Sequence, residues 1–132
     1  MGNFATFHKD GLSTIHVELG PRAVFVITGS VGYMVDIQAK LVREIGFGIT
    51  HSWFEDSLQA IVISNGLSFE AFNEDRLLWE SRRFSFDGIR NIQQHDLSVT
   101  GEAYDPTSGA DCWLPFHLDL VTGDVKGGSC FN

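Results

Sequence analysis

The sequence predicts an all-β protein, an antiparallel meander of about nine to eleven short strands. Three observations support this fold class. Several segments alternate between apolar and polar residues, two others are apolar throughout, and turn residues recur roughly every 8–20 residues. A chain of 132 residues fits one domain, because a single core can then bury about two-thirds of the unfolded surface. We therefore assign residues 1–132 to one domain, with propeller-blade-like units or a barrel-like closure.

Three segments alternate with a period of two residues, which is typical of half-buried strands. They are residues 13–19, 97–104 and 114–120. In the first segment Ile15 and Val17 take the apolar positions and His16 a polar one, and His117 takes a polar position in the last. We expect the apolar residues to face the core and the two histidines to face solvent.

Two further segments are apolar at every position, as expected of central strands that are covered on both faces. They are residues 23–27 and 60–63. The second segment is followed by Asn65 and Gly66, a pair that tolerates the positive φ angles of a tight hairpin turn. Both segments should therefore lie inside sheets, with hairpins connecting them to their neighbours.

The segment from Asp36 to Gly46 permits two interpretations. As a helix it has Asp36 as its N-cap and Gly46 at its C-terminal end, with Ile37, Leu41 and Ile45 on one face. The alternative is a strand over residues 41–44. A comparison of the chain with itself favours the strand, because a shift of 36 residues places these residues on a segment that reads as a strand, Leu77 to Glu80.

The same shift suggests a threefold internal repeat. Its units are residues 24–45, 60–81 and 96–117. Each unit has apolar residues followed by a hydroxyl residue, which is Thr28, Ser64 or Thr100. Such a period predicts stacked supersecondary units that loosely resemble propeller blades and leave an open sheet, a barrel-like closure or a partial ring. The third unit has polar Asp96 and Ser98 where the others are apolar, as expected of an end unit that exposes one face.

Charge and composition exclude several classes of partner. The net charge of −8 opposes the phosphate neutralisation that nucleic-acid binding requires. No stretch approaches the roughly 20 apolar residues of a membrane span. The two cysteines, Cys112 and Cys130, lack a CxxC spacing, and no secretory signal precedes them. We expect free thiols in the cytoplasm, although a bridge between the two remains an alternative.

No known catalytic or metal-binding motif occurs in the sequence, so we expect no catalytic constellation, metal or cofactor. The five histidines are scattered without metal-ligand spacing. His51 precedes Glu55 and Asp56, and His95 precedes Asp96. Either pair would suit a hydrolase-like acid–base function if folding brought the partners together.

The leading hypothesis is therefore a non-catalytic binding module whose partner is a protein or a second copy of the chain. Some small acidic β-proteins serve as adaptor or toxin-neutralising proteins, and this comparison is an analogy only. Acidic residues dominate after Asp96, whereas arginines gather before it, and such a two-signed surface suits a charged partner. The expected interaction residues are Trp53, Trp79, Arg82, Arg83 and Trp113. The alternatives are a small β-barrel that holds an apolar small molecule among its phenylalanines, and a hydrolase that uses His51 or His95.

Overall fold

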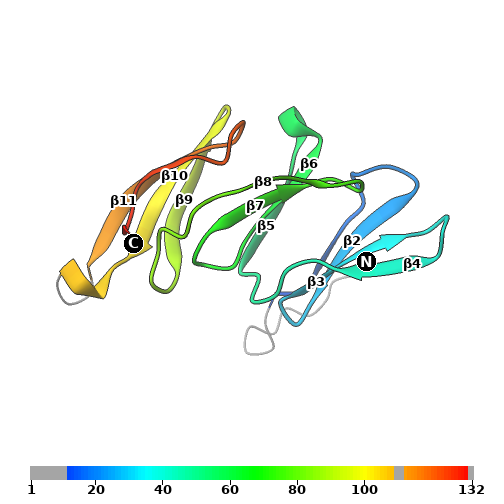
Figure 1. The fold of residues 1–132 in the computed structure, drawn as a ribbon, viewed down its shortest axis with the longest axis horizontal. Helices are drawn as coiled ribbons and strands as arrows, with labels where there is room; N and C mark the ends of the chain where they lie inside the picture. Colours follow the sequence, from blue (N-terminus) through cyan, green and yellow to red (C-terminus); the bar gives the residue numbers. More distant parts are fainter. Residues whose placement is uncertain (1–11, 109–111, 131–132) are drawn as a thin grey trace.

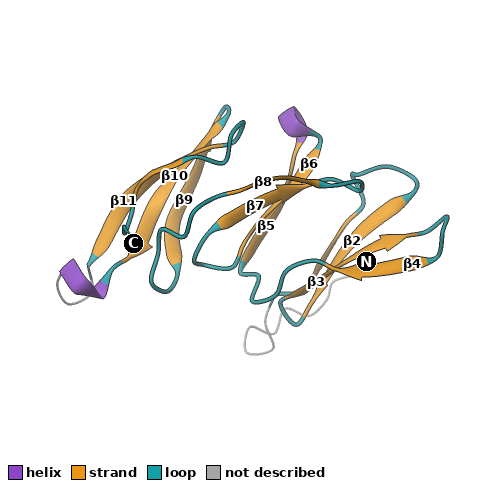
Figure 2. Ribbon diagram, in the orientation of Figure 1, coloured by secondary structure: helices purple, strands orange, loops and turns teal. Residues whose placement is uncertain are grey.

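The computed structural model describes residues 12–108 and 112–130, and these form an all-β fold (Figures 1 and 2). The described residues contain twelve strands in three antiparallel four-stranded sheets. Two short 3-10 helices, Asp56–Leu58 and Pro106–Ser108, interrupt the loops. In this part of the chain no helix has the length and apolar character that crossing a membrane requires. The predicted all-β antiparallel class is therefore confirmed.

Each sheet is a meander whose strands follow one another in sequence order. The first sheet consists of β1 (Thr14–His16), β2 (Ala23–Thr28), β3 (Val31–Asp36) and β4 (Leu41–Glu44). The second consists of β5 (His51–Glu55), β6 (Ala60–Ser64), β7 (Phe69–Phe72) and β8 (Leu77–Glu80). The third consists of β9 (Ile89–His95), β10 (Ser98–Tyr104), β11 (Trp113–Asp119) and β12 (Val125–Gly127). The described strands form open sheets, so of the two predicted forms the barrel-like closure is not found.

The three sheets follow one another along the long axis of the molecule, with the second sheet in the middle (Figure 1). Strand β6 is buried at all of its positions. Successive side chains of a strand point to opposite faces, so Ile61 and Ile63 join a core with the first sheet, while Val62 joins a core with the third. The prediction that residues 60–63 form a central, doubly covered strand is confirmed.

The corresponding prediction for residues 23–27 holds for one face of β2 only. Ala23, Phe25 and Ile27 are buried against the second sheet, but Val24 and Val26 are partly exposed. The reason is that the first sheet has a sheet on one side and no described element on the other. A continuous apolar run predicts burial on both faces, but it cannot show whether a second covering layer is present.

Phenylalanine rings fill both cores. Between the first and second sheets, Phe25 meets Phe72 edge-on, with ring centroids 4.8 Å apart. In the other core the Phe84 ring lies 5.5 Å from that of Phe69 and 4.6 Å from that of Phe116. Aromatic pairs at these separations stabilise a packed core beyond the area they bury. Many of the chain's phenylalanines therefore act as packing between sheets.

The segment from Asp36 to Gly46 contains a turn and the strand β4, not a helix. β3 ends at Asp36, whose Oδ1 accepts a hydrogen bond of 2.9 Å from the N–H of Ala39 in the following turn. Lys40 has a φ of 56°, which reverses the chain into β4. A hydrogen bond from a backbone N–H to an Asp side chain a few residues earlier can stabilise a turn in place of a helix. This explains why Asp36, the predicted N-cap, is followed by a turn.

Alternation places most residues of the later segments correctly and residues 13–19 incorrectly. Val99, Phe116 and Leu118 are buried as predicted, but Leu97 is 43% exposed, and in the first segment Ile15 is 44% exposed and Val17 is 63% exposed. In β1, His16 pairs with buried Phe25 and so faces the second sheet. The period of an alternating strand identifies its two faces, but the register on the neighbouring strand decides which face is buried. His117 is exposed as predicted, and both cysteines are free thiols.

A tight contact at Gly123 joins the second and third sheets. The indole N–H of Trp79 in β8 donates to the carbonyl of Leu120 at 2.8 Å. Gly123, in the loop between β11 and β12, lies against the indole ring with a φ of +79°, and a Cβ there would come within 2.5 Å of Trp79 Cε3. Only glycine fits this position without displacing the ring.

We predict that Gly123→Ala lowers the free energy of unfolding by about 2–4 kcal/mol, because a left-handed φ and an overpacked ring both add to the cost. The matched control is Gly48→Ala, since Gly48 has a φ of +68° and no atom within 4 Å of an added Cβ. That variant should lose only about 1 kcal/mol. Urea denaturation of the two variants measures the difference, and equal losses would show that the indole contact contributes nothing.

Candidate functional site

Two of the five predicted interaction residues, Trp79 and Arg82, join the second sheet to the third. Trp79 is partly buried and packs against the core between these sheets. The Arg82 guanidinium donates to the carbonyls of Gly127 at 2.6 Å and Ser129 at 2.7 Å. Their hydrogen-bonding groups are used within the molecule, and we therefore describe them as structural contacts.

Trp53 and Arg83 also make internal contacts. The Trp53 ring meets Phe69 edge-on at 6.2 Å, and its N–H donates to Glu55 Oε1 at 3.1 Å. Arg83 donates through Nε to the carbonyl of Ser85 at 2.9 Å, and its guanidinium lies 5.8 Å from the ring centroid of Phe86. Trp53 thus stabilises the core from an edge strand, whereas Arg83 holds the loop before β9.

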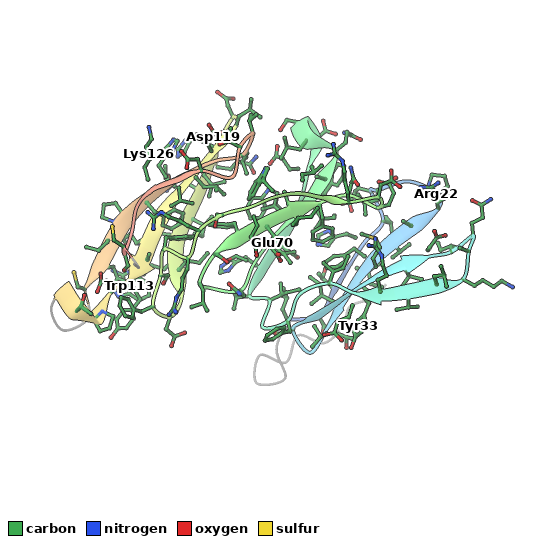
Figure 3. All side chains as sticks on the ribbon, viewed as in Figure 1. Arg22, Tyr33, Glu70, Trp113, Asp119 and Lys126 are labelled. Carbon is green, nitrogen blue, oxygen red and sulfur yellow. The ribbon has the colours of Figure 1, made fainter. Side chains whose placement is uncertain are left out.

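Trp113 lies elsewhere, at the far end of the third sheet (Figure 3). The Arg90 guanidinium stacks 4.2 Å from its ring centroid, and Tyr104 packs 5.3 Å away. Arg90 also pairs with Glu102 at 2.9 Å. The five residues therefore occupy several parts of the molecule, and the structure does not bring them together into one surface.

The outer face of the first sheet is mostly apolar, and no described element covers it. Register places Val24 of β2 beside Val35 of β3, which lies beside Val42 of β4. We call this surface the valine face; it comprises Ile15, Val24, Val26, Val31, Tyr33, Val35 and Val42, and the polar residues Thr28 and Glu44 lie at its margins beside Val31 and Tyr33. Val42, on its β4 edge, is 63% exposed. Branched side chains in such rows normally pack against another layer.

The outer face of the third sheet, at the opposite end of the stack, is polar. Thr100 pairs with His117, which pairs with Lys126, while Glu102 pairs with Arg90. Figure 3 places Lys126 and Tyr33 toward opposite ends of the molecule. The stack therefore has one polar end, which water solvates, and one apolar end.

A second feature lies where three edge strands meet. β1, β5 and β9 are each at the edge of a sheet. Together they line a cavity of about 330 Å³, whose walls include Leu12, Trp53 and Ile92. His16 and Ser52 also line it. The cavity thus brings chemically active side chains of the first two sheets to one place.

In this cavity His16 lies between a hydroxyl and a carboxylate. Its Nε2 is 2.9 Å from Ser52 Oγ, and its Nδ1 is 3.6 Å from Glu18 Oε1. The imidazole stacks on Phe25 with centroids 6.4 Å apart, and the His16 side chain is 11% exposed. Burial lowers the pKa of His16 below its usual value, although the nearby Glu18 carboxylate opposes this shift. The ring is therefore neutral at pH 7, with one nitrogen free to accept a proton.

This cluster was not predicted, because the alternation of residues 13–19 placed His16 on the solvent side of β1. A signal for it was nevertheless present, since His16 and Ser52 lie 36 residues apart, the same spacing as in the internal comparison. Equivalent positions of neighbouring stacked units lie side by side. Applied to the polar residues, that rule would have predicted the contact.

The two histidines proposed for catalysis have other partners. The Nδ1 of His51 lies 2.9 Å from Thr50 Oγ1, and His95 Nε2 lies 3.2 Å from Thr100 Oγ1. Glu55, near His51 in sequence, is buried and accepts hydrogen bonds from Trp53, Ser57 and Gln94 instead. Within the described residues neither histidine forms an ion pair with a carboxylate.

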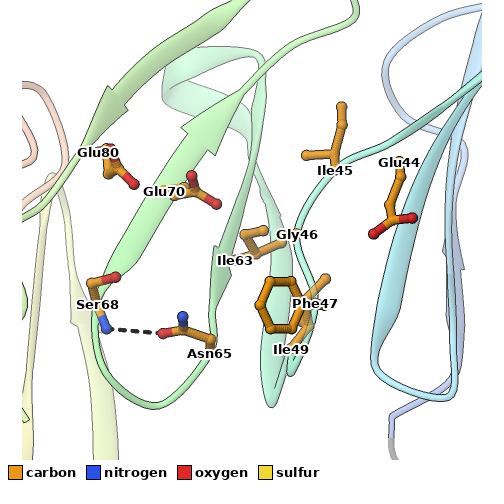
Figure 4. A pocket seen from close by; sticks show the side chains of 10 residues that line it. All are labelled: Glu44, Ile45, Gly46, Phe47, Ile49, Ile63, Asn65, Ser68, Glu70 and Glu80. Carbon is orange, nitrogen blue, oxygen red and sulfur yellow. Dashed lines mark hydrogen bonds between the residues drawn. The ribbon is translucent and has the colours of Figure 1, made fainter.

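A third feature is a pocket of about 440 Å³ between the first two sheets (Figure 4). Glu70 of β7 and Glu80 of β8 are cross-strand neighbours that line it, and Ile63 of β6 lines it as well. Burial raises the pKa of Glu70, and the like charge of Glu80 raises it further. Among residues 12–108 and 112–130, no three histidine, cysteine or acidic side chains form a group that could hold a metal ion.

No protein-family model matches the chain, and no curated protein matches it significantly. Its function is therefore inferred from the valine face, the Ser52–His16–Glu18 cluster and the carboxylate pocket.

We predict that Glu70→Gln increases stability at pH 7. Because the pKa of Glu70 is raised in the folded state, the folded protein binds the Glu70 proton more tightly than the unfolded chain does. The free energy of unfolding therefore falls as the pH rises from the unfolded pKa, about 4.5, through the folded pKa. Glutamine carries no ionisable proton, so the variant does not lose this stability. Because Glu70 is partly exposed, the gain at pH 7 should be small, on the order of 0.5 kcal/mol, and should vanish at acidic pH.

The control is Glu102→Gln, which should act in the opposite direction. Hydrogen bonds from Arg90 and Asn91 lower the pKa of Glu102, so its carboxylate stabilises the fold at pH 7 and ceases to do so as pH falls through its folded pKa. Urea midpoints at pH 7 and pH 4 measure both variants. A destabilised Glu70→Gln protein at pH 7 would contradict the proposed repulsion.

Proposed function

We propose that the protein is an interaction module, and that its partner at the valine face is a second copy of the same chain. One observation supports this above all: the described fold covers every apolar sheet face except one. The two inner interfaces bury rows of branched and aromatic residues. The valine face has the same chemistry and stays open to water, which favours a further sheet packed on it.

The valine face is complementary to itself. Val24 and Val26 of β2 are neighbours of Val35 and Tyr33 of β3. A two-fold axis between β2 and β3, parallel to both, places Val24 of one copy on Val35 of the other, and Val26 on Tyr33. At the edges Ile15 of one copy then faces Glu44 of the other, and the exposed Glu44 carboxylate lies at the rim of the contact. Contacts of this isologous type are the commonest in homo-oligomers, and they close at two subunits.

The polar end of the stack is a poor match for the valine face. Arg90, Glu102 and Lys126 belong to strands whose outer face would be buried in a head-to-tail contact. Burying charged groups against valines costs free energy without new partners. Association should therefore stop at the dimer instead of continuing into a fibre.

The size of the face predicts a weak dimer. The four strands contain 3, 6, 6 and 4 residues, so at about 3.3 Å per residue and a spacing of about 4.8 Å they give a projected area of about 300 Å² per copy. Stable complexes bury about 800 Å² per partner. We therefore expect a reversible dimer with a Kd of roughly micromolar or above.

The spacing of the strands suggests how the module is built. β4 and β8 are the fourth strands of their sheets and begin 36 residues apart, at Leu41 and Leu77. A further 36 residues reach Trp113 in β11, which is the third strand of its sheet. We propose three blade-like repeats, the last with a longer connection before its third strand. The free thiols of Cys112 and Cys130 suit a reducing compartment such as the cytoplasm.

We predict that Val42→Lys weakens the dimer, because the new ammonium would lie in an apolar interface. Val42 is 63% exposed in the single chain, so the fold should be unaffected. Sedimentation velocity over a concentration range up to about millimolar covers the expected Kd. The dimer's Kd should rise at least about tenfold.

His117→Lys is the matched control, since it adds the same group to the exposed outer face of the third sheet. It should leave the dimer unchanged. A wild-type protein that sediments as a monomer at every concentration would overturn the proposal, as would a dimer that Val42→Lys does not weaken.

A further inference from the structure

We propose that Ser52 and His16 form a nucleophilic site that hydrolyses small neutral esters, with Glu18 as its positioning residue. The site lies in the cavity between the edge strands β1, β5 and β9. It goes beyond the interaction function and uses none of the residues of the valine face. The proposal replaces His51 and His95 by a histidine that contacts both a nucleophile and an acid.

The order of contacts is that of a serine nucleophile with its general base. His16 Nε2 lies 2.9 Å from Ser52 Oγ, within hydrogen-bond distance. On the other side of the ring, Nδ1 faces Glu18 Oε1 at 3.6 Å. With the proton of the neutral ring on Nδ1, Nε2 is left to accept the proton of Ser52. Glu18 then selects this tautomer and stabilises the imidazolium that forms.

The surroundings of His16 hold the ring in place. Phe25, which is fully buried, stacks on the imidazole. Ser52 is fixed by the pairing of β5 with β6, where it lies opposite Ile63. The lowered pKa of His16 keeps the base unprotonated at neutral pH. Nucleophile and base thus come from different sheets, but each is attached to a packed strand.

The cavity wall defines the class of substrate. Leu12, Trp53 and Ile92 supply apolar surface, and the other lining residues are threonines, histidines and Ser52. No carboxylate, lysine or arginine lines this cavity among the described residues. A volume of about 330 Å³ fits a short acyl chain. An uncharged ester with a small acyl group therefore fits better than a charged peptide or a phosphate ester.

The reaction has two steps and consumes only water. Ser52 Oγ forms a bond to the acyl carbon and passes its proton to His16 Nε2. The ester C–O bond then breaks, and His16 returns the proton to the leaving oxygen, which departs as the alcohol. Water attacks the acyl-serine and gives its proton to His16. The bond between the acyl carbon and Oγ breaks, Oγ is reprotonated, and the acid is released.

The transition state also needs donors for a developing oxyanion. β5 is an edge strand with a sheet neighbour, β6, on one side only. Edge strands leave alternate backbone N–H groups without a strand partner, and such groups beside Ser52 are suited to this role.

The test uses two probes on the full-length chain. A fluorophosphonate probe should label wild-type protein, and peptide mass spectrometry should locate the adduct on Ser52. With p-nitrophenyl butyrate as substrate, Ser52→Ala should lower kcat/KM by about 10²–10⁴-fold. Ser98→Ala is the matched control, because the Ser98 hydroxyl donates to the carbonyl of His95 and contacts no base. It should leave labelling and turnover unchanged.

Glu18 is tested through the pH profile. Wild-type activity should fall on the acid side as His16 becomes protonated, below pH 6.5, because its pKa is lowered from that value. In Glu18→Gln the carboxylate that favours the imidazolium is gone, so this acid limb should move to lower pH while kcat falls. A purely structural role for Glu18 would not move the limb.

The proposal is overturned if the fluorophosphonate labels no serine or a serine other than Ser52. It is equally overturned if folded Ser52→Ala turns over the ester at the wild-type rate. Labelling of the wild-type protein needs no variant, so it decides the question even if a substitution prevents folding. Weaker dimerisation in Val42→Lys with retained labelling would separate this site from the interaction function.

Discussion

Strand β6 is buried on both of its faces, and the arrangement of the other eleven described strands depends on this constraint. Its alternate side chains supply two different cores: Ile61 and Ile63 pack toward the first sheet, and Val62 packs toward the third. A strand with one polar face would support only a two-layer sandwich. Because β6 has none, the second sheet requires a covering sheet on each side, and the chain supplies one from before it and one from after it.

Stacking in this way leaves two end faces, and their chemistry differs. The third sheet ends the stack with Thr100, His117 and other polar side chains, whereas the first sheet ends it with valines. Stacking also brings together the edge strands β1, β5 and β9, whose residues line one cavity. The proposed association and the proposed ester hydrolysis thus follow from one architecture, the first from an uncovered end and the second from aligned edges.

The sequence predicted the fold class well because its signals are local. Alternation, continuous apolar runs and turn residues identified most strands, and the self-comparison correctly favoured a strand at Leu41–Glu44 over a helix. The alternation in residues 13–19 did not predict which face of β1 is buried, because the buried face is set by the pairing of His16 with Phe25 of β2. For the same reason Val24 and Val26 were expected in a core, although nothing described covers them.

Functional residues were harder to predict than strands. Tryptophan and arginine were chosen for their frequency at interfaces, but Trp79 and Arg82 use their hydrogen-bonding groups inside the molecule. Residue type does not reveal whether a side chain finds an internal partner. The contact between His16 and Ser52 joins two sheets, and composition and motif spacing contain no information on it. The one signal in the sequence is the separation of 36 residues between His16 and Ser52, which is the period of the proposed repeat.

The constraint on β6 is tested most directly by native-state hydrogen exchange, followed for each strand. If β6 is the shared layer of two cores, its amides should exchange only through global unfolding, with the same free energy as denaturant unfolding. The edge strands β4 and β12, with their exposed residues, should exchange through smaller local openings. Amides of β6 that exchange as readily as those of β4 would contradict the account.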